Sequence, residues 1–264
     1  MKKIITFLLL VCTSSLLAHE FWMQPDKFMY KWNERINIKF FVGENFEGEN
    51  WSGNRSRINS LKVHFSDVTD DLSVAIGDEK GDSLQLSVTD EGTAMVTFNN
   101  NNSFIELEAQ KFNDYLKEDG LADALEYRQK NGEMDSVGKE YYQRSVKTIL
   151  QIGNKLTEVY KKQTDLPLDI VLQSNPYGVK KKGEIKARIL FGGKPLPNSV
   201  CKLWQRYKGN TSMKEVTANM NGEISFETEP FGRWMVSTVK MVRLQDDAKA
   251  HWQSYWGSVT WGYY

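Results

Sequence analysis

The chain has 264 residues, with 34 basic and 34 acidic side chains. This length is enough for one large domain or two of ordinary size, and the even charge balance argues against an extended basic surface for nucleic acids. Beyond the first eighteen residues, no stretch is apolar enough to span a membrane.

Residues 1–18 have the pattern of a secretory signal peptide. Lys2 and Lys3 form a basic start, residues 4–11 form an apolar stretch too short to span a bilayer, and Ala18 is a small residue at the cleavage position. We therefore expect cleavage after Ala18 and export to the periplasm.

Cleavage after Ala18 would make His19 the first residue of the mature chain. Its free α-amino group and its imidazole Nδ1 can then close a six-membered chelate ring on one metal ion. An amine with a pKa near ~8 gives up its proton to a metal at neutral pH. Nitrogen ligands favour nickel, cobalt, copper or zinc over magnesium and calcium. The alternative is that His19 merely follows the cleavage site.

Residues 19–103 are predicted to form an N-terminal β domain. Four segments alternate apolar and polar residues, as half-buried strands do, and clusters of Gly, Asn and Asp separate them: 36–40, 61–65, 84–88 and 95–98. His64 lies between Val63 and Phe65 and is expected to point to the opposite, exposed face.

Residues 104–165 are predicted to form a helical insert and a returning strand. Apolar residues of 106–117 fall mainly on one helical face, and Asp119-Gly120 ends that helix. A second short helix is expected at 121–130 and a strand at 146–152. Arg144 and Lys147 could form an anion site, or they could make ordinary salt bridges to acids such as Glu140.

Residues 166–244 are predicted to form an immunoglobulin-like or transthyretin-like β domain. Its five predicted strands are 168–172, 184–190, 199–205, 222–226 and 234–240. Cys201, the only cysteine left after cleavage, lies in one of them and is expected to be a buried, inert thiol. The predicted fold is thus mainly β, with two β-sandwich-like domains.

The tail, residues 245–264, is unusually aromatic. Tyr255, Val259, Trp261 and Tyr263 share one face of a predicted strand. So much apolar surface would not stay exposed, so we expect the tail to return to the N-terminal domain.

A tight metal site needs at least one ligand beyond the two of His19. His251 is the candidate, because the tail is expected to return to the domain that begins at His19. Asp246 and Asp247 lie nearby in the sequence and could add an oxygen. The alternative is that His251 is an ordinary histidine at an interface.

The order of motifs resembles a family of exported bacterial proteins with a domain of unknown function, often labelled as the periplasmic component of ABC-type cobalt or nickel transport. The matching segments are HEFWMQP at 19–25, FNDYLKEDGL at 112–121, EYYQRSVK at 140–147, NPY at 175–177, GKPL at 193–196 and WQSYW at 252–256. The resemblance implies a periplasmic location, a metal role for His19 and a membrane transporter as partner. It supplies no catalytic residues.

Three functional hypotheses follow. The first is a metal-binding accessory protein that passes a divalent transition ion to an uptake system. The second is a carbohydrate- or protein-binding module that uses exposed aromatic side chains and no metal. The third is a copper oxygenase built on the N-terminal histidine. The sequence has no GxSxG element, phosphate loop or HExxH motif, so we expect no enzymatic activity.

Overall fold

The computed structural model describes residues 20–264, which form three β-sheets and two short helices. The predicted fold class, mainly β with sandwich-like packing, is confirmed. The predicted helices are also present, as α1 (Ala109–Glu118) and α2 (Ala122–Lys130). Gly120 ends α1 with a φ of 67°, and a Cβ on it would approach the Val200 side chain to 2.7 Å.

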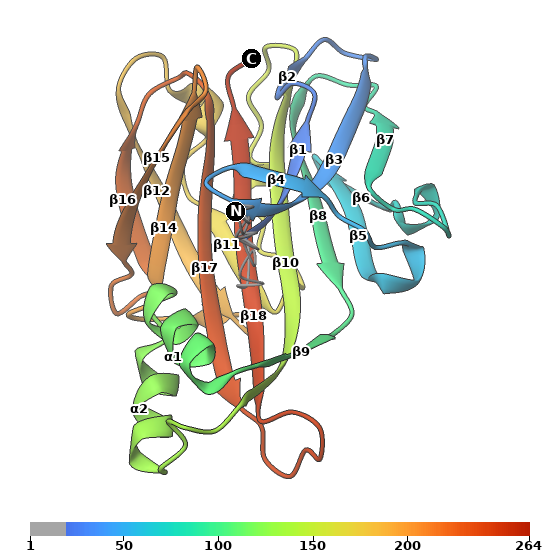
Figure 1. Cartoon of the computed structure of the whole chain (residues 1–264). Helices are drawn as coiled ribbons and strands as arrows, with labels where there is room; N and C mark the ends of the chain where they lie inside the picture. The colour runs from blue at the N-terminus through green and yellow to red at the C-terminus, as the bar shows by residue number, and fades with distance from the viewer. Residues whose placement is uncertain (1–19) are drawn as a thin grey trace, which may run out of the picture.

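A ten-stranded sheet runs through the described part of the chain, and its long strands β10, β17 and β18 lie side by side in Figure 1. Its main order is β15-β14-β17-β18-β10-β8-β5-β6, and β2 and β9 also pair with β10. The ten strands are β2 (Met29–Tyr30), β5 (Ile58–Phe65), β6 (Val68–Asp71), β8 (Gly92–Asn100), β9 (Ser103–Leu107), β10 (Gly138–Ile152), β14 (Val200–Tyr207), β15 (Asn210–Thr217), β17 (Arg233–Arg243) and β18 (Trp252–Gly262).

Two smaller sheets cover the two faces of this central sheet. Side chains of β10 alternate between them: Val146 and Leu150 join the core under the first sheet, and Ile149 joins the core under the other. The first sheet contains β1 (Glu20–Pro25), β3 (Arg35–Glu44), β4 (Glu47–Asn50) and β7 (Ser83–Ser87). The other contains β11 (Leu168–Leu172), β12 (Gly183–Phe191), β13 (Lys194–Pro195) and β16 (Glu223–Thr228).

The aromatic tail forms β18, in the middle of the central sheet. β18 pairs parallel with β10 and antiparallel with β17, so it joins the segment predicted as an insert to the last strand of the second β region. It also touches the first sheet, because Ser258 Oγ donates to the Phe21 carbonyl (2.7 Å) and Thr260 Oγ1 to the Met23 carbonyl (2.9 Å). The predicted boundaries between domains stay a prediction.

The tail's side chains predicted to share one face of β18 do share it, and that face packs against the sheet of β11 and β12. Val259 and Trp261 are buried in the core beneath β11 and β12, and Tyr255 and Tyr263 pack against the same core. Trp256 lies on the other face of β18, where it packs with α1.

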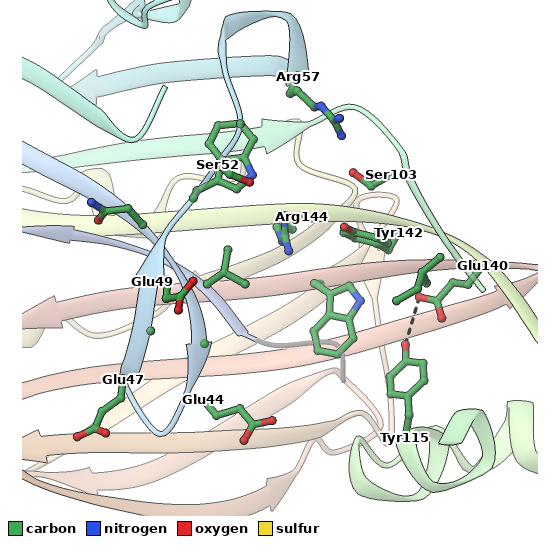
Figure 2. A pocket seen from close by; sticks show the side chains of 18 of the residues that line it. Glu44, Glu47, Glu49, Ser52, Arg57, Ser103, Tyr115, Glu140, Tyr142 and Arg144 are labelled. Atoms are coloured by element: carbon green, nitrogen blue, oxygen red, sulfur yellow. Dashed lines mark hydrogen bonds between the residues drawn. The ribbon is translucent and has the colours of Figure 1, made fainter. Parts of the chain in front are cut away.

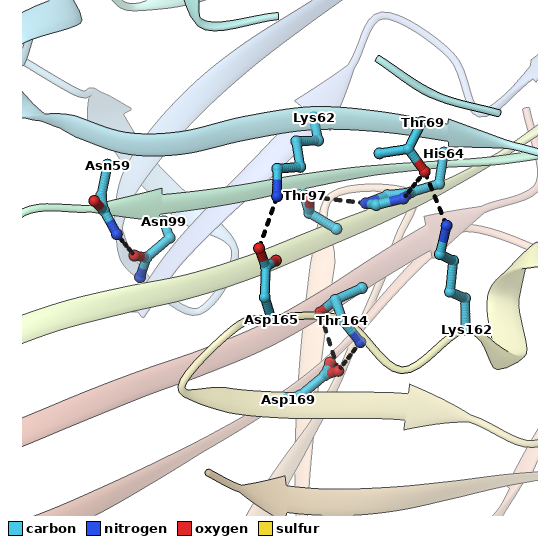
Figure 3. A network of polar contacts seen from close by, with 10 residues as sticks. All are labelled: Asn59, Lys62, His64, Thr69, Thr97, Asn99, Lys162, Thr164, Asp165 and Asp169. Carbon is cyan, nitrogen blue, oxygen red and sulfur yellow. Dashed lines mark hydrogen bonds and ion pairs between the residues drawn. The ribbon is translucent and has the colours of Figure 1, made fainter. Parts of the chain in front are cut away.

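The expectation that His64 is exposed is wrong. Its ring is buried, with Nδ1 3.0 Å from Thr69 Oγ1 and Nε2 3.2 Å from Thr97 Oγ1 (Figure 3). Burial lowers its pKa to about 4. The alternation of β5 was predicted correctly, but the segment carrying Lys162 and Asp165 covers the face that was expected to be open. Both faces of this strand are therefore covered.

Four short 3₁₀ turns complete the described structure: η1 (Arg55–Arg57), η2 (Ser73–Ala75), η3 (Val159–Lys161) and η4 (Pro176–Gly178). The one that matters for the site is η1, because it follows β4 and brings Arg57 to the edge of a large cavity.

Candidate functional site

A cavity of about 730 Å³ lies between the β3–β4 hairpin and α1, beside the central sheet (Figure 2). This volume is within the range of roughly 300–1,000 Å³ that is usual for small-molecule sites. Its lining includes aromatic, acidic and basic side chains, among them Trp51, Arg57, Tyr115, Glu140, Tyr142, Arg144 and Trp256.

Strand β10 contributes three polar side chains to this cavity at alternate positions. Glu140, Tyr142 and Arg144 lie two residues apart, so a strand directs all three to the same face. That face is the one that carries Val146 and Leu150 beneath the first sheet. The sheet therefore holds a carboxyl, a phenol and a guanidinium in a row along one wall.

Glu140 is 1% exposed and lies in a hydroxyl-rich network. Its Oε1 accepts hydrogen bonds from Tyr115 Oη (3.3 Å) and from Ser254 Oγ, which in turn accepts from Trp256 Nε1 (3.0 Å). Its Oε2 has no hydrogen-bond partner among residues 20–264. Burial raises the pKa of Glu140 to about 8, although the two hydroxyl donors oppose that shift. The carboxyl is therefore largely protonated at neutral pH.

Arg144 places its guanidinium over two aromatic rings. Its Cζ lies 4.8 Å from the ring centroid of Phe21 and 5.1 Å from that of Tyr142. Its backbone is also fixed, because its N–H donates to Asn100 Oδ1 (2.6 Å) and its carbonyl accepts from Asn99 Nδ2 (2.7 Å). Within the described chain, it forms no ion pair with a carboxylate. Burial lowers the pKa of Arg144, and Tyr142 opposes that shift.

A smaller cavity of about 170 Å³ adjoins the large one, and the two share Glu44 and Tyr115 as lining residues. The small cavity is rich in acids: Glu20, Glu44, Glu118 and Asp119 line it, with Lys202 as the only basic lining residue. Lys202 Nζ lies 2.6 Å from Asp119 Oδ1. Burial raises the pKa of Glu20 to about 7, and Lys202 opposes that shift.

The metal ligand predicted first, His19, lies outside the described residues. Glu20, the next residue, begins β1 and is buried at the acidic cavity. The acids of this cavity were not predicted as a group, because they come from β1, β3 and the end of α1.

The structure does not bring His251 to Glu20. Phe21 lies level with Ser258 on β18, and His251 precedes Ser258 by seven residues, which is about 20 Å at roughly 3.3 Å per residue. His251 is bound to β10 at its backbone, where its N–H donates to the Lys139 carbonyl (2.9 Å).

The other residues singled out from the sequence lie away from the cavities. Asp246 and Asp247 are in an exposed turn, where Asp247 accepts from the N–H groups of Lys249 and Ala250 (both 2.8 Å). Lys147 points to the face opposite Arg144 and forms a buried ion pair with Asp169, so these two cations do not share a site. Cys201 is buried, as expected, and burial raises the pKa of its thiol to about 11.

The sequence prediction missed the row of Glu140, Tyr142 and Arg144. Residues 140–144 (EYYQR) do not alternate apolar and polar types, and the returning strand was predicted to begin only at residue 146. In the structure β10 begins at Gly138. Extending the strand backwards would have placed the three side chains on one face.

Residues 20–264 contain no group of three or more His, Cys, Asp or Glu side chains arranged to hold a metal ion. In the same part of the chain, no helix has the length and apolar character needed to cross a membrane.

A family model described as "Domain of unknown function (DUF4198)" matches residues 16–241. No curated protein matches the chain significantly. Two similar solved structures are the D0-D1 domain of intimin and a mutant alpha-2-macroglobulin from Salmonella. The first is 13% identical, with 91% of this chain and 97% of that chain covered and a TM-score of 0.24. The second is 8% identical, with 92% of this chain but 15% of that chain covered, and its TM-score is also 0.24. Likenesses this distant carry no argument about function.

Proposed function

The chain belongs to the DUF4198 family, and we propose that it is an exported periplasmic protein that binds a divalent transition metal through His19 as its mature N-terminus. The observation that carries the proposal is the position of Glu20. The chain enters the described fold at a buried acidic cavity, where a bound cation would be favoured.

Glu20 is the first described residue, and its side chain lines the acidic cavity. Four acids line this cavity and Lys202 alone offsets them, which favours a divalent cation electrostatically.

The proposed ligand set is the α-amine and Nδ1 of His19 with one carboxylate of the acidic cavity. Glu20 is the carboxylate nearest along the chain. Two nitrogens and one oxygen suit nickel, cobalt, copper or zinc. His251, the third ligand predicted from the sequence, lies about 20 Å from Ser258, the residue of β18 that is level with Phe21. A carboxylate of the acidic cavity therefore takes its place in the proposed ligand set.

The resemblance to the periplasmic cobalt and nickel transport proteins supports a role beside an uptake system. In that role the protein would capture an ion in the periplasm and deliver it to a membrane transporter.

Titrating the processed protein with Ni²⁺ or Cu²⁺ in a calorimeter tests the proposal. We expect one ion per chain, with binding much weaker in His19→Ala and in a chain carrying one extra residue before His19. The extension keeps every side chain but moves the free amine out of chelating reach. His251→Ala is the matched control and should bind like the native protein. Equal binding by native and extended chains would contradict the proposal.

A second candidate is a module that binds an organic molecule without metal, such as a carbohydrate. The tail offers little for it, because Trp252, Trp256 and Trp261 are buried and cannot stack on an external sugar. The observation in its favour is the large cavity, where Tyr142 and Trp256 both line the wall. Metal titration separates the two candidates.

A further inference from the structure

We propose that the large cavity binds a small organic carboxylate, whose carboxylate group lies on Arg144 and Arg57 and whose apolar body lies against Tyr142 and the adjoining apolar wall. This inference concerns the side of the cavity formed by β10, β9 and η1. It does not depend on the metal site proposed at His19.

Arg144 is the main observation. Its guanidinium lies over the rings of Phe21 and Tyr142 and has Tyr142 as a polar partner, but no carboxylate among residues 20–264 pairs with it. Removing a cation from water without a counter-charge is costly, and an anion from outside would offset that cost. The guanidinium borders the cavity, so such an anion can reach it.

The chemistry of this group favours a carboxylate. A guanidinium is planar and presents N–H donors in a fork that matches the two oxygens of a carboxylate. Stacking on two rings and the two hydrogen bonds to its backbone hold Arg144 in place. Less conformational freedom would therefore be lost when the ligand binds.

Arg57 adds a second cation at the same end of the cavity. It comes from η1 and lines the cavity. Figure 2 shows Glu44 and Glu47 toward the hairpin end, away from Arg57 and Ser103, and Glu140 beyond Tyr142 along β10. Two of the hairpin acids, Glu44 and Glu47, therefore lie away from Arg57.

The rest of the wall indicates the body of the ligand. Ile105, Leu107, Tyr142 and Trp256 supply apolar and aromatic surface next to the basic end. The acids on the far side would repel a second negative charge, which favours a monoanion over a polyphosphate. An arylalkyl carboxylate has these properties, and a cavity of about 730 Å³ has room for it.

The probe for the test is 3-phenylpropionate, titrated calorimetrically into the His19→Ala protein so that a metal ion at His19 cannot contribute. We expect saturable binding of one molecule per chain. Phenylethylamine, with the opposite charge, should not bind. Inorganic phosphate should bind at least about tenfold more weakly, because it lacks the apolar body.

Arg57→Gln and Arg55→Gln form a matched pair. Both arginines are exposed in the same short turn, but only Arg57 lines the cavity. We expect Arg57→Gln to weaken binding about tenfold, the usual effect of losing one charge-assisted hydrogen bond, and Arg55→Gln to leave it unchanged. Arg144→Lys keeps the charge but loses the fork, and should weaken binding at least as much.

Three results would overturn the inference. They are no saturable binding of 3-phenylpropionate, equal binding of phosphate, and equal effects of the Arg55 and Arg57 substitutions. If a thermal melt shows that Arg144→Lys does not fold, the comparison of Arg57→Gln with Arg55→Gln still tests whether the cavity binds the carboxylate. Loss of metal binding together with retained probe binding would leave this inference standing and sink only the proposed metal site.

Discussion

Glu140 shows how one buried side chain makes stability depend on pH. In the unfolded chain its carboxyl has an ordinary pKa of 4.5, and burial in the fold raises that value to about 8. Between these two values the unfolded state loses a proton that the folded state retains. The contribution of Glu140 to the free energy of unfolding is therefore fully present below about pH 4.5 and is lost as the pH rises through about 8.

We predict that Glu140→Gln weakens this pH dependence. The amide oxygen can still accept from Tyr115 and Ser254, but the side chain no longer ionises. Urea unfolding at pH 5 and at pH 8 measures the effect. Between pH 5 and pH 8 the free energy of unfolding should fall by a few kcal/mol more in the native protein than in the variant, since each unit of pKa shift corresponds to about 1.4 kcal/mol. If the free energy of unfolding falls by the same amount in both proteins, Glu140 ionises in the fold as readily as in the unfolded chain.

Lys147 and Asp169 form a buried pair between β10 and β11. Each is 1% exposed, and Asp169 Oδ2 also accepts from the Thr164 N–H (2.7 Å) and hydroxyl (3.0 Å). The pair lies on the face opposite Arg144. It is therefore a structural contact between the central sheet and the sheet of β11, not part of the cavity.

We predict that Lys147→Met destabilises the protein by about 3–5 kcal/mol, because it leaves the Asp169 charge buried without a partner. The double variant Lys147→Met with Asp169→Asn should recover much of that loss. Lys186→Met, which removes an exposed ion pair with Glu184, is the control and should cost less than about 1 kcal/mol. If urea unfolding shows that Lys147→Met and Lys186→Met lower the free energy of unfolding equally, the Lys147–Asp169 pair is not a buried structural contact.

At the scale of elements, β18 joins the sequence-distant parts of the fold. It pairs with β10 on one edge and β17 on the other, and its two faces contact the first sheet and the sheet of β11. Trp261 is fully buried there, stacked 6.3 Å from Trp234. Packing in this strand should therefore control the stability of the whole sheet.

Trp261→Ala and Trp32→Ala test this role. Trp261 is 0% exposed and Trp32 is 62% exposed. We expect Trp261→Ala to cost about 3–5 kcal/mol and Trp32→Ala to stay within about 0.5 kcal/mol of native, as measured by thermal or urea unfolding. A native-like melt for Trp261→Ala would mean that β18 is dispensable.

Most elements could be predicted from the sequence because their signals are local. Alternation identified β5, the one-faced pattern and Asp119-Gly120 identified α1, and the aromatic face of β18 was predicted correctly. The partners of the strands could not be predicted. β10 and β18 pair across more than a hundred residues, and a period of two specifies a face but not a neighbour.

The same limit applies to the site. His19 and His251 were grouped because the tail was expected to return to the first domain. The tail does contact β1, but the register places Ser258, not His251, beside Phe21. The cavity was missed because its lining comes from β3, β4, β9, β10, α1 and β18, and their meeting depends on the whole sheet.

At the scale of the whole molecule, the proposed metal site lies beside Glu20, where the described chain begins, and the proposed organic-anion site lies in the large cavity next to it. The metal site requires a free amine on His19. Any residue left before His19 would move that amine away from the acidic cavity and remove the chelate. The proposed metal binding therefore depends on one predicted cleavage event.

The most direct measurement is the N-terminal sequence of the protein recovered from its exported fraction, obtained by Edman degradation or by mass spectrometry of the intact chain. We predict a chain that begins His-Glu-Phe-Trp-Met, with residues 1–18 removed after Ala18. A mature chain that begins at any other residue would contradict the metal chelate.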